Sequence, residues 1–304
     1  MNLAELSAVV SDEAKAFELI ERMRWPNGPV CPHCGGVDRI YDLRKTRMGL
    51  RKCGHCRKQF TVRVGSIFED SPIPLGKWIL AIHLMCSSKK GISSNQLKRE
   101  LGISYQSAWF LTHRVRLAMT MDPLASLLGV DNGVVELDET FVGGKPKNNK
   151  HHNKTAKAGK KTIVMTLVDR EGDAVGVVVP DTKKRTLEAI AKPLVDKSAT
   201  IMTDANPSYR SLDAYFRAHH AVDHDKQFVR AVIIHTNFAE SYHSLLKRGL
   251  IGAFHHVSAE HLHRYVNEFS WRWNTRKETD GERTERTIRA TAGKRLTYKP
   301  LITH

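Results

Sequence analysis

The chain has 304 residues, of which 41% are apolar, and a formal net charge of +16 at pH 7. This length predicts two or three domains, and the apolar content excludes wholesale disorder. No apolar run is long enough to cross a bilayer and the N-terminus lacks the features of a signal peptide, so we expect a cytoplasmic protein without a membrane partner. The excess of Lys and Arg predicts a polyanionic partner, nucleic acid first, the alternative being a basic protein with no such partner.

The first predicted elements are an N-terminal helix within residues 1–27 and a zinc ribbon over residues 28–70. Apolar residues recur at helical spacing as far as Met23, and the run WPNGP at 25–29 ends the helix. Two Cys-x2-Cys pairs follow, separated by 18 residues: Cys31, Cys34, Cys53 and Cys56. Their spacing predicts four thiolates around one structural Zn²⁺, with redox-active or merely buried thiols as the alternative.

Residues 71–125 are predicted to form a helix-turn-helix DNA-binding domain. Three helical patterns cover 75–90, 92–101 and 104–119, and Gly91 and Gly102 separate them. The last helix would present Tyr105, Gln106 and Ser107 at its N-terminal end, where base edges are read, with Arg114 and Arg116 further along. A helical packing module without DNA contacts is the alternative.

From residue 130 to 276 the pattern changes to that of an α/β domain. Strand patterns at 134–144, 161–179 and 199–204 alternate with a helix at 184–195, and a further strand at 229–234 precedes a helix at 237–248. This order predicts a mixed sheet covered by helices. A basic loop at 145–161 interrupts the first two strands, and residues 277–304 are predicted to be a loose charged tail.

Three acidic residues occupy positions from which they can converge. Asp138 lies within the first strand, Asp204 follows a buried strand, and Glu240 lies on the last helix of this domain. Carboxylates gathered at one point repel one another unless a cation neutralises them, and hard oxygen ligands suit two Mg²⁺ or Mn²⁺ ions for phosphoryl transfer. Lys247, two turns after Glu240, would contact DNA near the scissile phosphate. Ordinary surface or capping acids are the alternative.

Several motifs together give the chain a family resemblance. In chain order they are CPHCGG with CGHCRKQF, ELDETFVGGK, TDANPSY, HTNFAESYHSLLKRGLIGAFHHVS and YVNEFSWRWNTR. This series, over roughly residues 15 to 280, resembles the IS1595 (ISXO2-like) transposases of bacterial insertion sequences. The resemblance implies an RNase H-like catalytic domain of the DDE type, preceded by the zinc ribbon and the helix-turn-helix. It also implies that Asp138, Asp204 and Glu240 bind the catalytic metal ions and that Lys247 assists, with Asn237 as an alternative or additional third ligand.

The resemblance implies a DNA transposase that cleaves a strand at the 3′ end of its element and transfers it to target DNA. Its partners would be double-stranded DNA, as terminal inverted repeats and as target, and further copies of itself in a homodimer or larger assembly at the nucleoid. Two alternatives stay open. One is a DNA-binding regulator whose α/β domain is not catalytic, and the other is a metal-dependent nuclease without strand transfer.

Overall fold

The structure is a computed structural model that describes residues 3–122, 127–143, 161–222 and 234–302. It divides into two compact units. Unit 1 comprises Met1–Met119 with Lys277–His304, and unit 2 comprises Thr120–Arg276. The boundary near residue 120 lies close to the predicted one. The C-terminal segment, predicted to be a separate tail, instead belongs to unit 1.

Unit 1 begins with two helices where the sequence pattern predicts one. They are α1 (Leu3–Val10) and α2 (Glu13–Arg24). Asp12 separates them, because its side chain accepts hydrogen bonds from two backbone N–H groups at the start of α2. A small antiparallel sheet follows, made of β1 (Ile40–Asp42), β2 (Arg51–Cys53) and β3 (Gln59–Phe60). Strands this short bury little apolar surface, so the ribbon needs another source of stability.

The helical bundle contains the predicted helix-turn-helix. Its helices are α3 (Leu75–Ser87), α4 (Ser94–Leu101) and α5 (Tyr105–Ala118). Ser93 and Ser104 cap α4 and α5 with their side chains, and Gly102 ends α4 at a φ of 58°, a conformation that favours glycine. The apolar residues that form its core are all buried: Leu97, Leu101, Ala108, Leu111 and Val115.

Arg114 and Arg116 stabilise this bundle from inside. They are only 3% and 1% exposed. Arg114 lies over the ring of Phe110 and donates a hydrogen bond to the carbonyl of Leu296, while Arg116 donates to the hydroxyl of Thr112. Burial lowers the pKa of Arg114 to about 10, which leaves it charged at neutral pH. The end of α5 that begins at Tyr105 is therefore the accessible part of this helix.

The segment after residue 277 packs within unit 1. Helix α9 (Asp280–Arg289) contacts α3 and begins with a capping box formed by Thr279 and Glu282. Beyond it, Gln106 on α5 donates a hydrogen bond of 2.7 Å to the hydroxyl of Tyr298. The last helix is α10 (Lys299–Ile302). A capped helix with tertiary contacts is inconsistent with a loose tail over the described residues.

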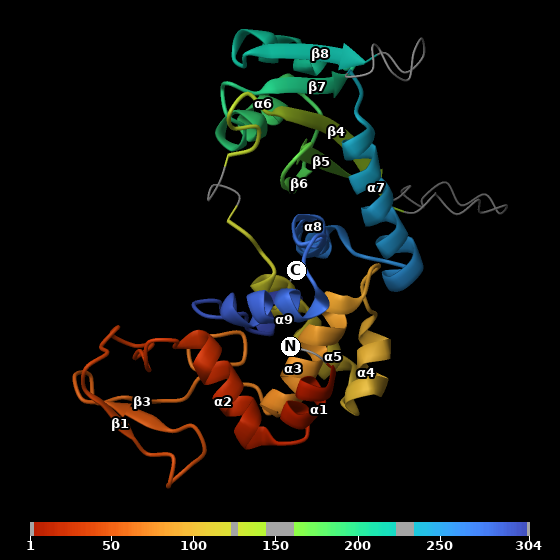
Figure 1. Ribbon diagram of the computed structural model, residues 1–304. Helices are drawn as coiled ribbons and strands as arrows, with labels where there is room; N and C mark the ends of the chain where they lie inside the picture. The colour runs from red at the N-terminus through yellow and green to blue at the C-terminus, as the bar shows by residue number, and fades with distance from the viewer. Residues whose placement is uncertain (1–2, 123–126, 144–160, 223–233, 303–304) are drawn as a thin grey trace, which may run out of the picture. The chain divides into compact units, whose positions relative to one another are not determined.

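Unit 2 is built on a five-stranded sheet, in the order β6-β5-β4-β7-β8 (Figure 1). The strands are β4 (Val134–Val142), β5 (Thr162–Asp169), β6 (Ala174–Val179), β7 (Thr200–Asp204) and β8 (Ala218–Val222). β4, β5 and β6 pair antiparallel, whereas β7 and β8 run parallel to β4. The predicted mixed sheet of an RNase H-like α/β fold is confirmed.

The structure adds one strand to the predicted sheet domain, and two predicted segments of this domain lie almost entirely outside the described residues. The fifth strand, β8, was not among the predicted strands. The predicted strand at 229–234 lies outside the described residues except for its last position, and so does the basic loop at 145–161 except for Lys161.

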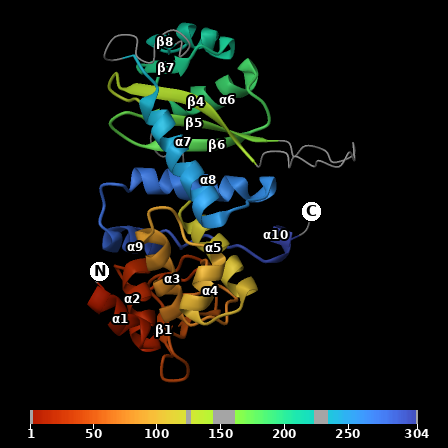
Figure 2. The same cartoon turned by 90° about the vertical axis from the view of Figure 1, so that its right-hand side faces the viewer.

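Helices cover both faces of the sheet. On one face, α6 (Lys184–Leu194) and the 3₁₀ helix η1 (Pro207–Ala214) pack on a core that includes Leu137. On the other, α7 (Asn237–Gly249) and α8 (Ala259–Asn274) pack on a core that includes Val164, and a short π-helix, η2 (Leu250–Phe254), joins them (Figure 2). Within the described part of the chain, no helix is both long and apolar enough to span a membrane.

Candidate active site

Asp138 and Asp204 lie beside one another where the pairing of the two central parallel strands ends. The last residue pair between β4 and β7 is Leu137 with Thr203, so the next residue of each strand is an aspartate. Oδ1 of Asp138 accepts a hydrogen bond of 2.7 Å from the backbone N–H of Glu139, and Oδ1 of Asp204 accepts one of 3.1 Å from that of Asn206. These contacts orient both carboxylates. The predicted meeting of the two aspartates is therefore present in the structure.

Glu139 joins the two aspartates. One carboxylate oxygen from each of the three residues lies within 4.8 Å of those of the other two. Neighbouring residues on a strand normally point to opposite faces. Here the pairing of β4 with β7 ends at Leu137, so Asp138 and Glu139 lie just beyond the part of β4 that pairs with β7. We call Asp138, Glu139 and Asp204 the acidic cluster.

The electrostatics of Glu139 reflect this crowding. Burial, followed by the charges of Asp204 and Asp138, raises the pKa of Glu139 to about 7, although the nearby Tyr209 hydroxyl acts in the opposite direction. Tyr209 is fully buried, and burial raises its own pKa. Despite their proximity, Oε1 of Glu139 and the hydroxyl of Tyr209 lack a well-formed hydrogen bond to the described residues. Buried polar atoms in that state are costly unless a further ligand satisfies them.

The donor set of the acidic cluster fits a hard divalent cation. Three carboxylates close to one another supply the oxygen ligands that Mg²⁺ and Mn²⁺ prefer. A cation would remove the repulsion among them and would give the Glu139 Oε1 atom a partner. These residues would therefore hold the metal predicted from the sequence.

Helix α7 brings a further set of side chains to this end of the sheet. His243 lies with Nδ1 3.4 Å from Oδ2 of Asp138 and Nε2 3.0 Å from the hydroxyl of Thr166 on β5. Burial, together with the charge of Lys247, lowers the pKa of His243 to about 4, so it is neutral at physiological pH. Glu240 and Lys247 flank His243 at helical spacing, which places them at the edge of the same face.

The remaining predicted ligands lie outside the acidic cluster. Asn237 and Glu240, in the first turn of α7, are both exposed. Among the described residues, Glu240 does not belong to the group of acidic side chains whose ligand atoms lie within 4.8 Å of one another. The structure thus brings Asp138 and Asp204 together with Glu139. Of the two candidate third ligands, Glu240 lies one helical turn before the histidine that contacts Asp138, and Asn237 lies at the start of the same helix.

The raised pKa of Glu139 makes a prediction about stability. The unfolded side chain ionises above pH 4.5 but the folded one only above about pH 7, so ionisation opposes folding. This opposing contribution is complete above pH 7 and fades as the pH falls toward 4.5. We expect Glu139→Gln to raise the free energy of unfolding of the metal-free protein by about 1–3 kcal/mol at pH 8, with the gain fading at pH 4.

Urea denaturation in the presence of a chelator measures this effect. The matched control is Glu171→Gln, which neutralises an exposed acid of the same unit and should change the stability by less than about 0.5 kcal/mol. A loss of stability at pH 8 in Glu139→Gln would contradict the crowded arrangement of the three carboxylates.

The second metal site lies in unit 1. Oppositely placed cysteines approach in two pairs, with Sγ distances of 3.7 Å between Cys31 and Cys56 and 3.6 Å between Cys34 and Cys53. All four sulfur atoms lie within 4.8 Å of one another, as a tetrahedral Zn²⁺ site requires. The N–H groups of Cys56 and, to a lesser extent, His55 lower the pKa of Cys53 to about 6, which favours the thiolate.

Two other observations limit this second site to the four thiolates. His55 lies within the second cysteine pair, but its Nε2 lies 2.7 Å from Oδ1 of Asp38. Cys86 is buried in α3, where its sulfur lies 3.4 Å from the hydroxyl of Thr287. With four thiolates the coordination of Zn²⁺ is complete, which is typical of a structural site.

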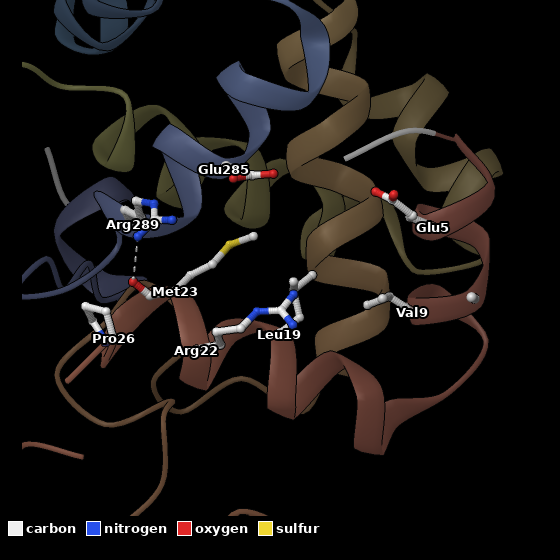
Figure 3. Close-up of a pocket in the computed structure, with 9 residues that line it drawn as sticks. Glu5, Val9, Leu19, Arg22, Met23, Pro26, Glu285 and Arg289 are labelled. Atoms are coloured by element: carbon white, nitrogen blue, oxygen red, sulfur yellow. Dashed lines mark hydrogen bonds between the residues drawn. The ribbon is translucent and has the colours of Figure 1, made fainter. Parts of the chain in front are cut away.

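A separate cavity of about 540 Å³ opens between α1, α2 and α9 of unit 1 (Figure 3). Its charged lining is balanced, with Glu5 and Glu285 opposite Arg22 and Arg289. Arg289 also donates a long hydrogen bond, 3.5 Å, to the carbonyl of Met23. This balance selects neither an anion nor a cation, so the cavity does not indicate a second active site.

Both candidate metal sites lie in segments that match known protein families. Residues 131–274 match the ISXO2-like transposase domain and residues 11–59 match the transposase zinc-ribbon domain. A protein of Halobacterium salinarum, described as an uncharacterized protein in transposable element ISH50, is 30% identical over 278 residues. The match covers 86% of this chain and 90% of that protein. The chain belongs to the IS1595 family of transposases. Both matched domains contain the metal-site residues described above.

Solved structures similar to this IS1595-family chain include two of the Mos1 transposase. They are a strand transfer complex and a pre-cleavage transpososome, each 14% identical and each covering 72% of this chain. The matches cover 79% and 80% of those chains, with TM-scores of 0.28 and 0.25.

Glu139 is the residue of this transposase that sequence reasoning missed. The alternation of buried residues in β4 assigns it to the face opposite Asp138. The available signal is the position of Glu139 in the run LDET, on a strand, β4, that extends beyond its pairing with the parallel strand β7. Only the register between β4 and β7 reveals where that pairing ends.

Proposed function

We propose that the protein cleaves DNA at the ends of its insertion sequence and joins the freed 3′ ends to target DNA. The observation that carries this proposal is the pairing of Asp138 and Asp204 on adjacent parallel strands, in a chain of the transposase family. In the first reaction, water attacks the phosphorus and the bond to the 3′ oxygen breaks. In the second, that 3′-hydroxyl attacks a target phosphorus, and the target's own 3′ oxygen leaves with a proton.

The residues of the site support these steps by position and charge. Asp138 and Asp204, with a third ligand from α7, would hold the cations against the scissile phosphate. When bound, Mg²⁺ activates the attacking oxygen and stabilises the leaving one. Lys247 contributes a positive charge on the exposed side of α7, where a phosphate backbone can reach it. His243 is neutral and buried, so it packs against the carboxylate of Asp138 without adding a charge to the site.

DNA is the proposed partner of both units. The net charge of +16 supplies the general attraction to phosphates. The helix-turn-helix offers Tyr105, 48% exposed, and Gln106 at the N-terminal end of α5, where terminal repeats would be read. Because two element ends must be joined in one event, we propose a dimer or larger assembly on DNA.

A strand-transfer assay separates the transposase from its rivals. Pre-cleaved end DNA, a target plasmid and Mg²⁺ are incubated with the protein, and joined products are resolved on a denaturing gel. A transposase gives joined products, whereas a nuclease gives cleavage without joining. Binding without either reaction would support a regulator and overturn the proposal.

The third metal ligand is tested by comparing two residues of one helical turn. A charged carboxylate is a stronger Mg²⁺ ligand than an amide, so we propose Glu240 as the principal ligand and Asn237 as its assistant. Glu240→Gln should lower the rate of strand transfer by about 100-fold or more, and Asn237→Ala by about 10-fold. The opposite ranking, measured under single-turnover conditions, would assign the third position to Asn237.

A further inference from the structure

Glu136 is a fully buried carboxylate that the proposed chemistry does not use. It lies on β4 two residues before Asp138, so both side chains point to the α7 face of the sheet. Its exposed fraction is 0%. A buried charge is costly unless it is paired and hydrogen-bonded, so its contacts indicate its purpose.

One oxygen of Glu136 caps the N-terminus of α7. Oε2 accepts hydrogen bonds of 2.8 Å from the backbone N–H of Phe238 and 3.0 Å from that of Ala239. The first N–H groups of a helix have no partner within the helix, and a negative charge is favourable there. Thr236, at the N-cap position, makes no such bond with its own side chain. Glu136, on strand β4, thus caps α7 in place of a residue next to the helix.

The other oxygen of Glu136 contacts the residue that follows β5 and a residue that precedes α7. Oε1 accepts a hydrogen bond of 2.7 Å from Nε of Arg170, which follows β5, and lies 3.2 Å from Nδ1 of His235. Arg170 in turn donates a hydrogen bond of 2.8 Å from Nη2 to the carbonyl of His235. The residues before α7 are therefore fixed by the same guanidinium that pairs with Glu136.

We propose that Glu136 is a positioning residue, which holds the first turn of α7 against β4 and thereby sets Asn237 and Glu240 relative to Asp138. Glu136 and Asp138 share one strand, and Asn237 and Glu240 flank the two amides that Glu136 binds. A shift of this turn changes the distance between the third ligand and the acidic cluster. The inference deepens the proposed function and rests on the proposed third ligand.

The test uses Glu136→Gln, which keeps the size of the side chain and removes its charge. The matched control is Glu268→Gln, which alters another fully buried glutamate of unit 2 that pairs with an arginine, Arg272, at 2.6 Å. Hydrogen exchange reports the cap directly. We expect the amides of Phe238 and Ala239 to lose protection by about 10-fold or more in Glu136→Gln only.

Binding of Mn²⁺ reports the metal site without DNA. We expect Glu136→Gln to weaken Mn²⁺ binding by about 10-fold to 100-fold, the effect typical of residues that orient metal ligands. In the double variant Asn237→Ala with Glu240→Ala, adding Glu136→Gln should change the affinity by less than about 2-fold, because its target is gone. Equal weakening in both backgrounds, or unchanged protection of the two amides, would overturn the inference.

These readouts also separate this inference from the proposed function. Exchange and Mn²⁺ binding require no strand transfer. A wild-type protein that binds Mn²⁺ and shows the expected cycle but joins no DNA would overturn the proposed function alone. A wild-type protein that joins DNA, with Glu136→Gln equal to it in Mn²⁺ affinity, would overturn the inference alone.

Discussion

Asp138→Asn is expected to reduce the rate of strand transfer by about 1,000-fold or more, because a neutral amide does not balance the charge of a divalent cation. Asp204→Asn should behave alike, since both aspartates directly follow the last residue pair between the same two parallel strands. The measurement is the rate of joined-product formation from pre-cleaved end DNA at saturating protein. The effect on DNA binding should be small, because removal of an acid near a phosphate backbone lessens repulsion.

The control for this prediction is Asp213→Asn, an exposed acid of η1 in the same unit. It should leave the rate unchanged within about 2-fold. Normal activity of Asp138→Asn, in a protein that shows the same unfolding transition as the wild type, would remove this residue from the active site.

Loss of zinc has the second large expected effect, on the folding of the ribbon. Structural Zn²⁺ contributes on the order of 10 kcal/mol to such small domains, and strands β1, β2 and β3 are too short to replace that contribution. Cys53→Ser, or treatment with a strong chelator, should unfold residues 28–60 and abolish specific binding to element ends. Zinc content measured by a colorimetric chelator, together with proteolysis of the ribbon, reports the change.

Cys86→Ser is the matched control for zinc removal. This cysteine lies in α3 and is not one of the four clustered thiolates. Its sulfur is hydrogen-bonded to the hydroxyl of Thr287. It should keep one zinc per chain and a protease-resistant ribbon. A Cys53→Ser protein that retained both would show that the four cysteines do not form the site.

Periodicity and spacing predicted much of the fold because each of those signals is local. A strand pattern that starts at residue 134 predicted β4, and helical patterns separated by Gly91 and Gly102 predicted α3, α4 and α5. The spacing of the cysteines predicted the cluster that the structure contains. The predicted convergence of Asp138 with Asp204 followed from their strand positions and the family resemblance.

What the sequence did not reveal depends on contacts between distant segments. Glu139 joins the acidic cluster only because β7 ends one residue earlier in register. An arginine is normally expected at the surface. Arg114 is buried instead, and the carbonyl of Leu296, which is distant in the sequence, accepts a hydrogen bond from it. The capping box at Thr279 was readable, but charge in the surrounding residues outweighed it and suggested a loose tail. No pattern within residues 235–240 could show that Glu136 caps their helix.

We propose that a divalent cation is held between Asp138 in β4, Asp204 at the end of β7 and the first turn of α7. Fe²⁺ in place of Mg²⁺, with ascorbate and peroxide, cleaves the backbone near the bound ion, and mass spectrometry locates the cuts. We predict cuts close to Asp138, Asp204 and residues 237–240, all lost in the double variant Asp138→Asn with Asp204→Asn. Cuts confined to other segments, or cuts at these positions that persist in the double variant, would contradict the account.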